Sequence, residues 1–172
     1  MHKEIVGTSG KHGMAHRDVK AKNILVKNNG ECCIGDLGLD IRDDYFKSIN
    51  YELEPNPNLQ VGTKRYRAPE ILSNTIDQHQ FNNFKKADIY SMALVKWEVL
   101  RRTRIGNRDS QETPEYQHLY YDHIDTDPNI EDMKNIVVKY RHRPEFDDEI
   151  CKFLLSNELI TLKSEEIRLT GR

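Results

Sequence analysis

Residues 84–102 restrict the fold of this chain most, because they predict a helix with apolar side chains on nearly every side. A helix that is apolar all round is buried at the centre of a domain. Arg101 and Arg102 suit the negative C-terminal end of such a helix. The other residues must pack around it, and 172 residues are enough for one ordinary domain or a large piece of a bigger one.

Two short apolar runs, residues 24–26 and 32–34, predict one small β-hairpin. Asn29-Gly30 lies between them and favours a two-residue type I′ turn, which needs positive φ at both central positions. Counting outward from this turn places Asn23 opposite Asp36, at the roughly 4.5–5.5 Å separation of directly opposed residues. The sequence therefore predicts that these two side chains meet at the open end of the hairpin.

Two further helices are expected in the second half of the chain. Residues 128–140 form an amphipathic pattern, with Asp127 as the predicted N-cap and Pro128 at the first helical position. Residues 147–163 predict another helix. The apolar positions expected on their buried faces are Ile130, Met133, Ile136, Val137 and Tyr140 in the first, and Ile150, Phe153, Leu154 and Leu159 in the second.

Residues 39–68 carry prolines and many polar side chains, and a loop of that length in a compact domain is usually functional or disordered. Within it, residues 40–60 are expected to be the most mobile part of the chain. Ser48 is the one Ser or Thr in that window and is a candidate phosphorylation site.

Charge and composition exclude several classes of protein. Lys plus Arg number 26 and Asp plus Glu 28, so a net charge of −2 gives no field for general nucleic-acid or membrane-surface binding. No run of 18 apolar residues is present, and the N-terminus has no secretory signal core. Three cysteines argue against a disulfide scaffold, so a reducing, cytosolic environment is favoured.

Four short motifs follow one another along the chain, and their order and spacing matter more than any one of them. This order resembles the C-terminal half of the protein-kinase catalytic domain, although any one triplet alone would be weak support. The expected fold is therefore mainly α, a protein-kinase-like C-lobe with one small β-hairpin at the catalytic loop. The motifs are His16–Asn23 (HRDVKAKN), Asp36-Leu37-Gly38, Gly62-Thr63 leading into Ala68-Pro69-Glu70, and Asp88 in the buried helix.

The residue types fit phosphoryl transfer, which needs an oriented acceptor hydroxyl and metal ions on the phosphates. Asp18 is placed as the base that accepts the hydroxyl proton. Lys20 offsets negative charge on the transferring group and contacts the nucleotide. Asn23 and Asp36 are oxygen ligands that suit Mg²⁺. The resemblance implies ATP with Mg²⁺ or Mn²⁺ as cofactors.

Other residues have structural roles in this interpretation. His16 is expected to be a packing and hydrogen-bonding scaffold rather than a base. Asp88 is expected to be buried and to accept hydrogen bonds from backbone N–H groups near His16 and Arg17, because a buried carboxylate without partners is too costly. Glu70 is the carboxylate that Arg168 pairs with, if Arg168-Leu169-Thr170 is the late Arg motif of kinases.

Lys20 and Thr63 indicate a serine/threonine rather than a tyrosine kinase, and in that class the Thr63 hydroxyl bridges Asp18 and Lys20. Three basic residues follow Thr63. They belong either to a peptide-binding lip or to a solvated loop, and both readings stay open. They are Lys64, Arg65 and Arg67.

Longer segments resemble the type I receptor serine/threonine kinases of the transforming-growth-factor-β superfamily over roughly residues 1–145. They include AHRDVKAKNILVKNNGECCIGDLGLDIR, VGTKRYRAPEIL and FKKADIYSMALVKWEVLRR. Leu37 is typical of type I rather than type II receptors, and the runs around Tyr116 and Tyr120 lean toward the activin/TGF-β branch. The resemblance implies the cytoplasmic kinase of a single-pass plasma-membrane receptor, activated by a type II receptor and acting on C-terminal serines of Smad proteins.

The sequence also departs from this family. The chain starts inside the helix before the catalytic loop, so the N-lobe and the membrane-spanning part are expected to be absent. Ala93 replaces a Gly, Arg67 replaces a Met, and the part 145–172 is atypical and shortened. Residues 1–172 are thus expected to be a partial kinase domain. It has a catalytic loop 16–23, a hairpin 24–35, an activation segment 36–70 and a central helix about 84–102. The alternative is an inactive fragment that acts as a binding or dominant-negative module.

Overall fold

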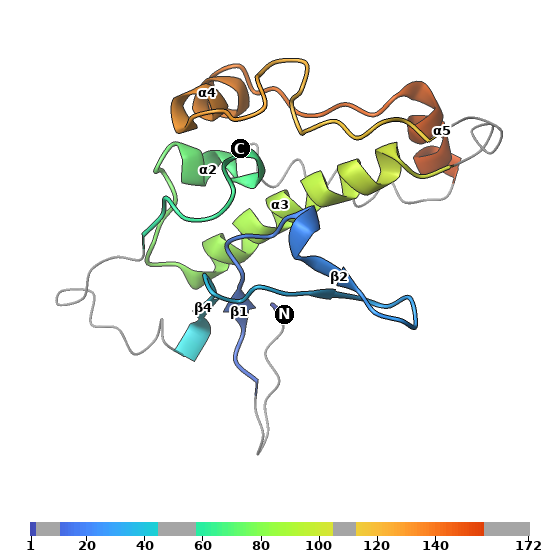
Figure 1. The fold of residues 1–172 in the computed structure, drawn as a ribbon. Coiled ribbons are helices and arrows are strands. Elements are labelled where there is room, and N and C mark those ends of the chain that lie inside the picture. Colours follow the sequence, from blue (N-terminus) through green and yellow to red (C-terminus); the bar gives the residue numbers. More distant parts are fainter. Residues whose placement is uncertain (3–10, 45–57, 105–112, 157–172) are drawn as a thin grey trace.

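The computed structural model describes residues 1–2, 11–44, 58–104 and 113–156 (Figure 1). Helices predominate, with two small two-stranded sheets. The helices are α2 (Pro69–Leu72), α3 (Phe81–Arg101), α4 (Ile130–Lys134), which continues as the π-helical turn η4 (Asn135–Lys139), and α5 (Asp148–Ser156). The 3₁₀ turns are η1 (Ala21–Asn23) and η2 (Lys64–Tyr66). The strands are β1 (Met14–Ala15), β2 (Ile24–Val26), β3 (Cys32–Ile34) and β4 (Ile41–Arg42).

The long helix α3 runs through the molecule, as the sequence predicts, with α2 and α4 on one side and the β2–β3 hairpin on the other (Figure 1). It begins at Phe81, three residues before the predicted start. The helix has no side-chain cap at Gln80, so the sequence holds no start signal there. Phe81 and Phe84 instead pack in a cluster with Ala15 and Ile41, which draws the first turn into the core.

The main core lies between α3 and the segments that cover it. Tyr90, Leu94 and Trp97 of α3 pack with buried residues of α2, the 119–120 segment and α4–η4. A smaller cluster joins Ile150 and Leu154 of α5 to Leu100 at the far end of α3. The central helix thus connects the apolar clusters, as a helix that is apolar on all sides requires.

The hairpin forms from the predicted strands, but its register differs by one residue from the prediction. Ile24 pairs with Ile34, so Asn23 lies opposite Gly35 rather than Asp36, and the Gly35 amide donates to the Asn23 carbonyl at 2.8 Å. The loop has three residues between Lys27 and Glu31, and Gly30 alone has positive φ (+83°) in it. In a three-residue loop, Asn29 does not need the left-handed backbone conformation that a type I′ turn requires.

The predicted helix 128–140 is also corrected in two respects. Its N-cap is Asn129, whose side chain forms a capping box with Asp132, and not Asp127. Residues 135–139 form a π turn, which holds more residues than an α turn and shifts the faces of the helix. Met133 and Val137 are therefore buried as predicted, whereas Tyr140 is 60% exposed.

The loop 39–68 contains structure that the sequence did not indicate. Ile41 and Arg42 form β4, which pairs antiparallel with β1. Ser48 and residues 45–57 lie outside the described residues, so the predicted mobility of 40–60 stays a prediction. The predicted helix 147–163 is confirmed over α5, while residues 157–172 lie outside the described part. No helix among the described residues is long and apolar enough to cross a membrane.

Candidate active site

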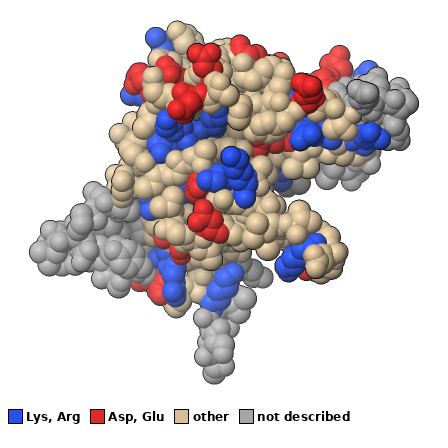
Figure 2. All heavy atoms as spheres, viewed as in Figure 1, with Lys and Arg blue, Asp and Glu red and all other residues tan. Residues whose placement is uncertain are grey.

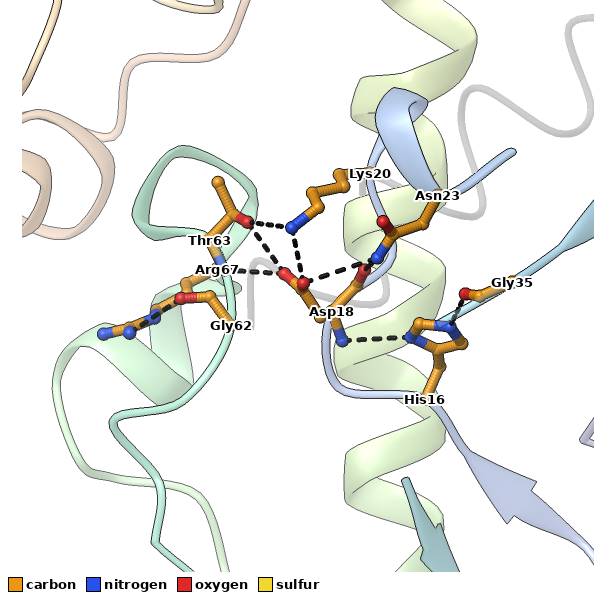
Figure 3. Close-up of polar contacts among 8 residues, drawn as sticks. All are labelled: His16, Asp18, Lys20, Asn23, Gly35, Gly62, Thr63 and Arg67. Atoms are coloured by element: carbon orange, nitrogen blue, oxygen red, sulfur yellow. Dashed lines mark hydrogen bonds and ion pairs between the residues drawn. The ribbon is translucent and has the colours of Figure 1, made fainter. Parts of the chain in front are cut away.

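A network of hydrogen bonds surrounds the Asp18 carboxylate (Figure 3). Its Oδ1 accepts from the Thr63 amide at 2.7 Å and from the Thr63 hydroxyl at 2.8 Å. Lys20 Nζ donates to Asp18 Oδ2 at 2.6 Å and to the Thr63 hydroxyl at 3.0 Å. The structure thus brings together three residues from two segments 43 residues apart, and the predicted bridge of Thr63 between Asp18 and Lys20 is confirmed.

These contacts decide the charge of Asp18. Burial by itself raises the pKa of this carboxyl, but hydrogen bonds from Lys20 and Thr63, together with the Lys20 charge, outweigh it. The pKa of Asp18 consequently lies below its usual value, and the side chain is ionised at neutral pH. Oδ1 already has two close donors, whereas Oδ2 has Lys20 and a longer contact of 3.4 Å from Asn23. Oδ2 is therefore the oxygen with capacity for a further donor.

Asn23 lies at the start of the hairpin, in the turn η1, and is buried. Its Nδ2 donates to the Asp18 carbonyl at 2.9 Å, which leaves Oδ1 as the atom that a cation could take. Asp36 follows Gly35, the residue opposite Asn23, in a left-handed conformation (φ 63°), and its side chain is exposed. The predicted direct opposition of Asn23 and Asp36 is wrong by one residue, but both remain at the same end of the hairpin.

The donor set fits a hard cation held in part by other ligands. Asn23 and Asp36 supply two oxygens, and Mg²⁺ is commonly bound through one or two protein oxygens together with substrate phosphates. Within the described ranges, no group of three or more His, Cys, Asp or Glu side chains is arranged to hold a metal ion. If a cation binds at this site, Asn23 and Asp36 would hold it together with oxygens of another molecule.

His16 is completely buried and connects the loop to the hairpin. Its Nε2 lies 2.8 Å from the Gly35 carbonyl, and its Nδ1 accepts from the Asp18 amide at 3.2 Å. This network assigns the ring proton to Nε2. Both ring nitrogens are occupied by backbone groups, so His16 acts as a scaffold, as the sequence predicts.

Asp88 on α3 fixes the backbone of the same loop. It is buried and accepts from the His16 amide at 2.6 Å and the Arg17 amide at 2.8 Å, which confirms the predicted contacts. His2 adds a third contact at 2.9 Å that the sequence did not indicate. Arg17 has positive φ (68°), an unfavourable conformation for a non-glycine residue, and the bond to Asp88 helps to hold it.

The basic residues after Thr63 do not form a solvated loop, because two of the three are buried, and the peptide-binding lip stays a prediction. Arg65 is buried and donates to the carbonyls of Leu119 and Asp125. Arg67 is buried too and donates to Gln60 and to the Gly62 carbonyl, each at 2.9 Å. Only Lys64 is substantially exposed, and it donates to the Pro128 carbonyl. Arg65 and Arg67 therefore hold neighbouring loops in place through buried hydrogen bonds. Their burial could not be predicted, because a polar segment gives no sign that its side chains turn inward.

Glu70 is the second residue of α2 and is partly buried. Burial raises the pKa of its carboxyl, and the charges of Arg143 and Lys86 oppose the rise without cancelling it. Its predicted partner Arg168 lies outside the described residues, so that pairing stays a prediction.

A groove of about 740 Å³ opens beside Lys20 and Thr63 and extends to Pro128. Lys22, Lys64 and Arg65 also line it, and Figure 2 shows Lys and Arg atoms gathered between α4 and the hairpin. At its wall the Tyr66 hydroxyl donates to Glu98 at 2.6 Å. Burial and the Glu98 charge raise the pKa of Tyr66, so this hydroxyl stays protonated.

Asp18 thus contacts Lys20 and Thr63, and Asn23 and Asp36 lie at one end of the neighbouring hairpin. The chain belongs to the protein kinase domain family, whose domain it matches over residues 10–169. The predominance of helices and the few strands are compatible with that fold.

Similarity to individual proteins refines this assignment. The chain is 50% identical over 144 residues to TGF-beta receptor type-1 of Homo sapiens and of Rattus norvegicus, and to Activin receptor type-1B of Homo sapiens. The matched region covers 84% of this chain and 27% of each receptor. The predicted resemblance to type I receptor kinases of the TGF-β superfamily is confirmed, and the chain spans about a quarter of the length of these relatives.

Proposed function

We propose that these residues carry serine/threonine kinase chemistry, the transfer of the ATP γ-phosphate to a Ser or Thr hydroxyl of a protein. The observation that carries the proposal is the network in which Thr63 and Lys20 hold the ionised Asp18. It leaves Asp18 Oδ2 with capacity for the acceptor hydroxyl, next to the Lys20 ammonium. Membership of the kinase family supports the same reaction.

Each residue then has one role. Asp18 orients the acceptor hydroxyl and takes its proton as the O–P bond forms. Lys20 offsets negative charge on the transferring phosphoryl group. Asn23 and Asp36 would hold Mg²⁺ or Mn²⁺, and the bound ion would neutralise charge on the ATP phosphates. His16, Arg17 and Asp88 keep the loop in place.

The groove beside Thr63 is the proposed seat of the acceptor polypeptide. It reaches the reacting residues at Lys20 and Thr63, and its size accommodates a few side chains. Its lysines suit a segment with acidic or phosphate groups. By resemblance to the receptors named above, the proposed substrate is a Smad-type protein phosphorylated on C-terminal serines, and the proposed activator is a type II receptor kinase. In that setting the chain is part of the cytoplasmic portion of a plasma-membrane receptor.

We also propose that the described residues form the helical lobe of the kinase, and that the 172-residue chain alone does not transfer phosphate. The sequence contains no Gly-x-Gly-x-x-Gly segment to cover the phosphates. Positioning of the reactants supplies about 7–11 kcal/mol of barrier lowering, so its loss is severe. The alternative function, a binding or dominant-negative module, then applies to the chain by itself.

The test compares two proteins in a radiolabelled-ATP assay with a Smad substrate. One is the 172-residue chain, and the other is the same chain preceded by the part of the TGF-beta receptor type-1 kinase domain that lies before the matched region. We expect transfer only by the fusion, abolished by Asp18→Asn and unchanged by Asp122→Asn, an exposed aspartate. Transfer by the fusion that survives Asp18→Asn would overturn the assignment.

The same assay separates the two functions. Asp18-dependent transfer by the 172 residues alone would contradict the inactive-fragment proposal. If the fusion is inactive while the chain lowers Smad phosphorylation by an intact type I receptor kinase, the binding-module function is favoured instead.

A further inference from the structure

Arg67 is buried immediately beside the catalytic network without being part of it (Figure 3). Its Nη1 donates to Gln60 Oε1, and its Nη2 donates to the carbonyls of Gln60 and Gly62, each at 2.9 Å. All three acceptors belong to the segment that directly precedes Thr63. We propose that Arg67 is a positioning residue, which holds residues 60–62 so that Thr63 stays on Asp18 Oδ1.

The contacts of Thr63 show why its approach must be held. Its amide and its hydroxyl both donate to the same carboxylate oxygen. The preceding residue, Gly62, has positive φ (+81°), and a Cβ there would lie 2.4 Å from the Arg17 carbonyl. The chain thus passes the catalytic loop at a distance that excludes side chains. The Arg67 guanidinium binds the carbonyls of Gln60 and Gly62 and so keeps this segment in position.

The backbone on either side of Arg67 is held in place by its neighbours. The turn η2 and the start of α2 flank it, and the Tyr66 carbonyl accepts a hydrogen bond from Ser91 on α3 at 2.7 Å. Arg67 Nε has no hydrogen-bond partner among the described residues. Arg67 also lines a cavity of about 30 Å³ with Arg17 and Asp88, which is enough room for one water. Ser91 thus holds the residue next to Arg67 on the central helix, while the Arg67 side chain holds the segment before Thr63.

This inference rests on the proposed function for its meaning, but its test needs no nucleotide and no phosphate transfer. In the 172-residue chain, hydrogen exchange of the Thr63 amide is measured relative to that of Leu94 in α3, and NMR records the chemical shift of the Thr63 amide proton, which reports its hydrogen bond to Asp18. For Arg67→Met we expect Thr63 exchange about tenfold faster, the cost of roughly one lost hydrogen bond. We also expect the Thr63 amide proton to move upfield, because its hydrogen bond to Asp18 weakens.

Two further variants make the result decisive. Arg67→Lys keeps the charge but not the guanidinium fork, so Thr63 exchange and the Thr63 amide shift should change in the same direction as in Arg67→Met. Arg65→Met removes another buried arginine of the same turn and should lower overall stability without changing either readout. Unchanged Thr63 exchange in Arg67→Lys, which also decides the matter if Arg67→Met does not fold, would overturn the proposal. Equal effects of Arg65→Met and Arg67→Met would overturn it too. Loss of kinase activity in the earlier assay bears on the function and not on this coupling.

Discussion

At the scale of single residues, Asp88 joins the catalytic loop to the core through backbone groups. The change Asp88→Ala should lower the free energy of unfolding by about 2–4 kcal/mol, because the amides of His16 and Arg17 would be buried without an acceptor. Urea denaturation measures this loss. Asp88→Asn keeps one acceptor oxygen and should cost less, so equal losses in the two variants would contradict the explanation.

Two glycines with positive φ offer a matched comparison. A Cβ at Gly62 would meet the Arg17 carbonyl at 2.4 Å, whereas one at Gly30 would meet nothing within 4 Å. Gly30→Ala should cost about 1–2 kcal/mol for the left-handed backbone alone. Gly62→Ala should cost about 1–3 kcal/mol more through the clash. Thermal unfolding of both variants measures the difference, and similar melting temperatures would refute the close approach of Gly62 to the loop.

At the scale of elements, the hairpin and α4 show where local patterns mislead. The strands of the hairpin follow from their apolar runs, but Asn29-Gly30 is compatible with both a two-residue and a three-residue loop. The choice between them shifts the partner of Asn23 by one residue. In the same way, Asp127 and Asn129 are almost equally good N-caps by residue type, so only the backbone path decides between them.

The cap of α4 can be tested directly. Asn129→Ala should lower the free energy of unfolding by about 1 kcal/mol, because the side chain accepts from the Asp132 amide at 2.9 Å. Asp127 is the control. Its carboxylate is 95% exposed and lies 3.6 Å from Lys64 Nζ, so Asp127→Ala should change stability by less than about 1 kcal/mol. A larger effect at Asp127 would restore the cap that the sequence predicts.

At the scale of the whole molecule, the pH dependence of stability reports on Glu70. Burial raises the pKa of the Glu70 carboxyl in the folded state. The contribution of Glu70 to the free energy of unfolding is therefore fully present below the pKa of the unfolded state, and it is lost as the pH rises through the pKa of the folded state. Glu70→Gln removes the ionisation. We expect this variant to gain stability relative to the wild type as pH rises from about 4 to 7.

Denaturation midpoints at several pH values measure this trend, with the exposed Glu115→Gln as control. A loss of stability in Glu70→Gln at neutral pH would mean that the carboxylate has a cation partner. Arg143, Lys86 and the predicted partner Arg168 would then be the candidates, because an opposite charge close to a carboxyl stabilises its ionised form, and Arg168→Met would test the pairing that the family resemblance implies.

The sequence by itself determined which side chains could carry the chemistry, because these are set by the spacing of motif residues. It also determined the central helix, because a helix depends on the period of its apolar residues. It determined Asp88 as a buried acceptor for the same reason, since a lone carboxylate on an apolar helix needs partners. Only the tertiary structure decided how Thr63 reaches Asp18 and that Arg65 and Arg67 turn inward. These contacts join residues that are distant in the chain. In the sequence, an arginine that will be buried cannot be told from an exposed one, because its acceptors come within reach only when the chain folds. Here these acceptors are the backbone carbonyls at positions 60, 62, 119 and 125.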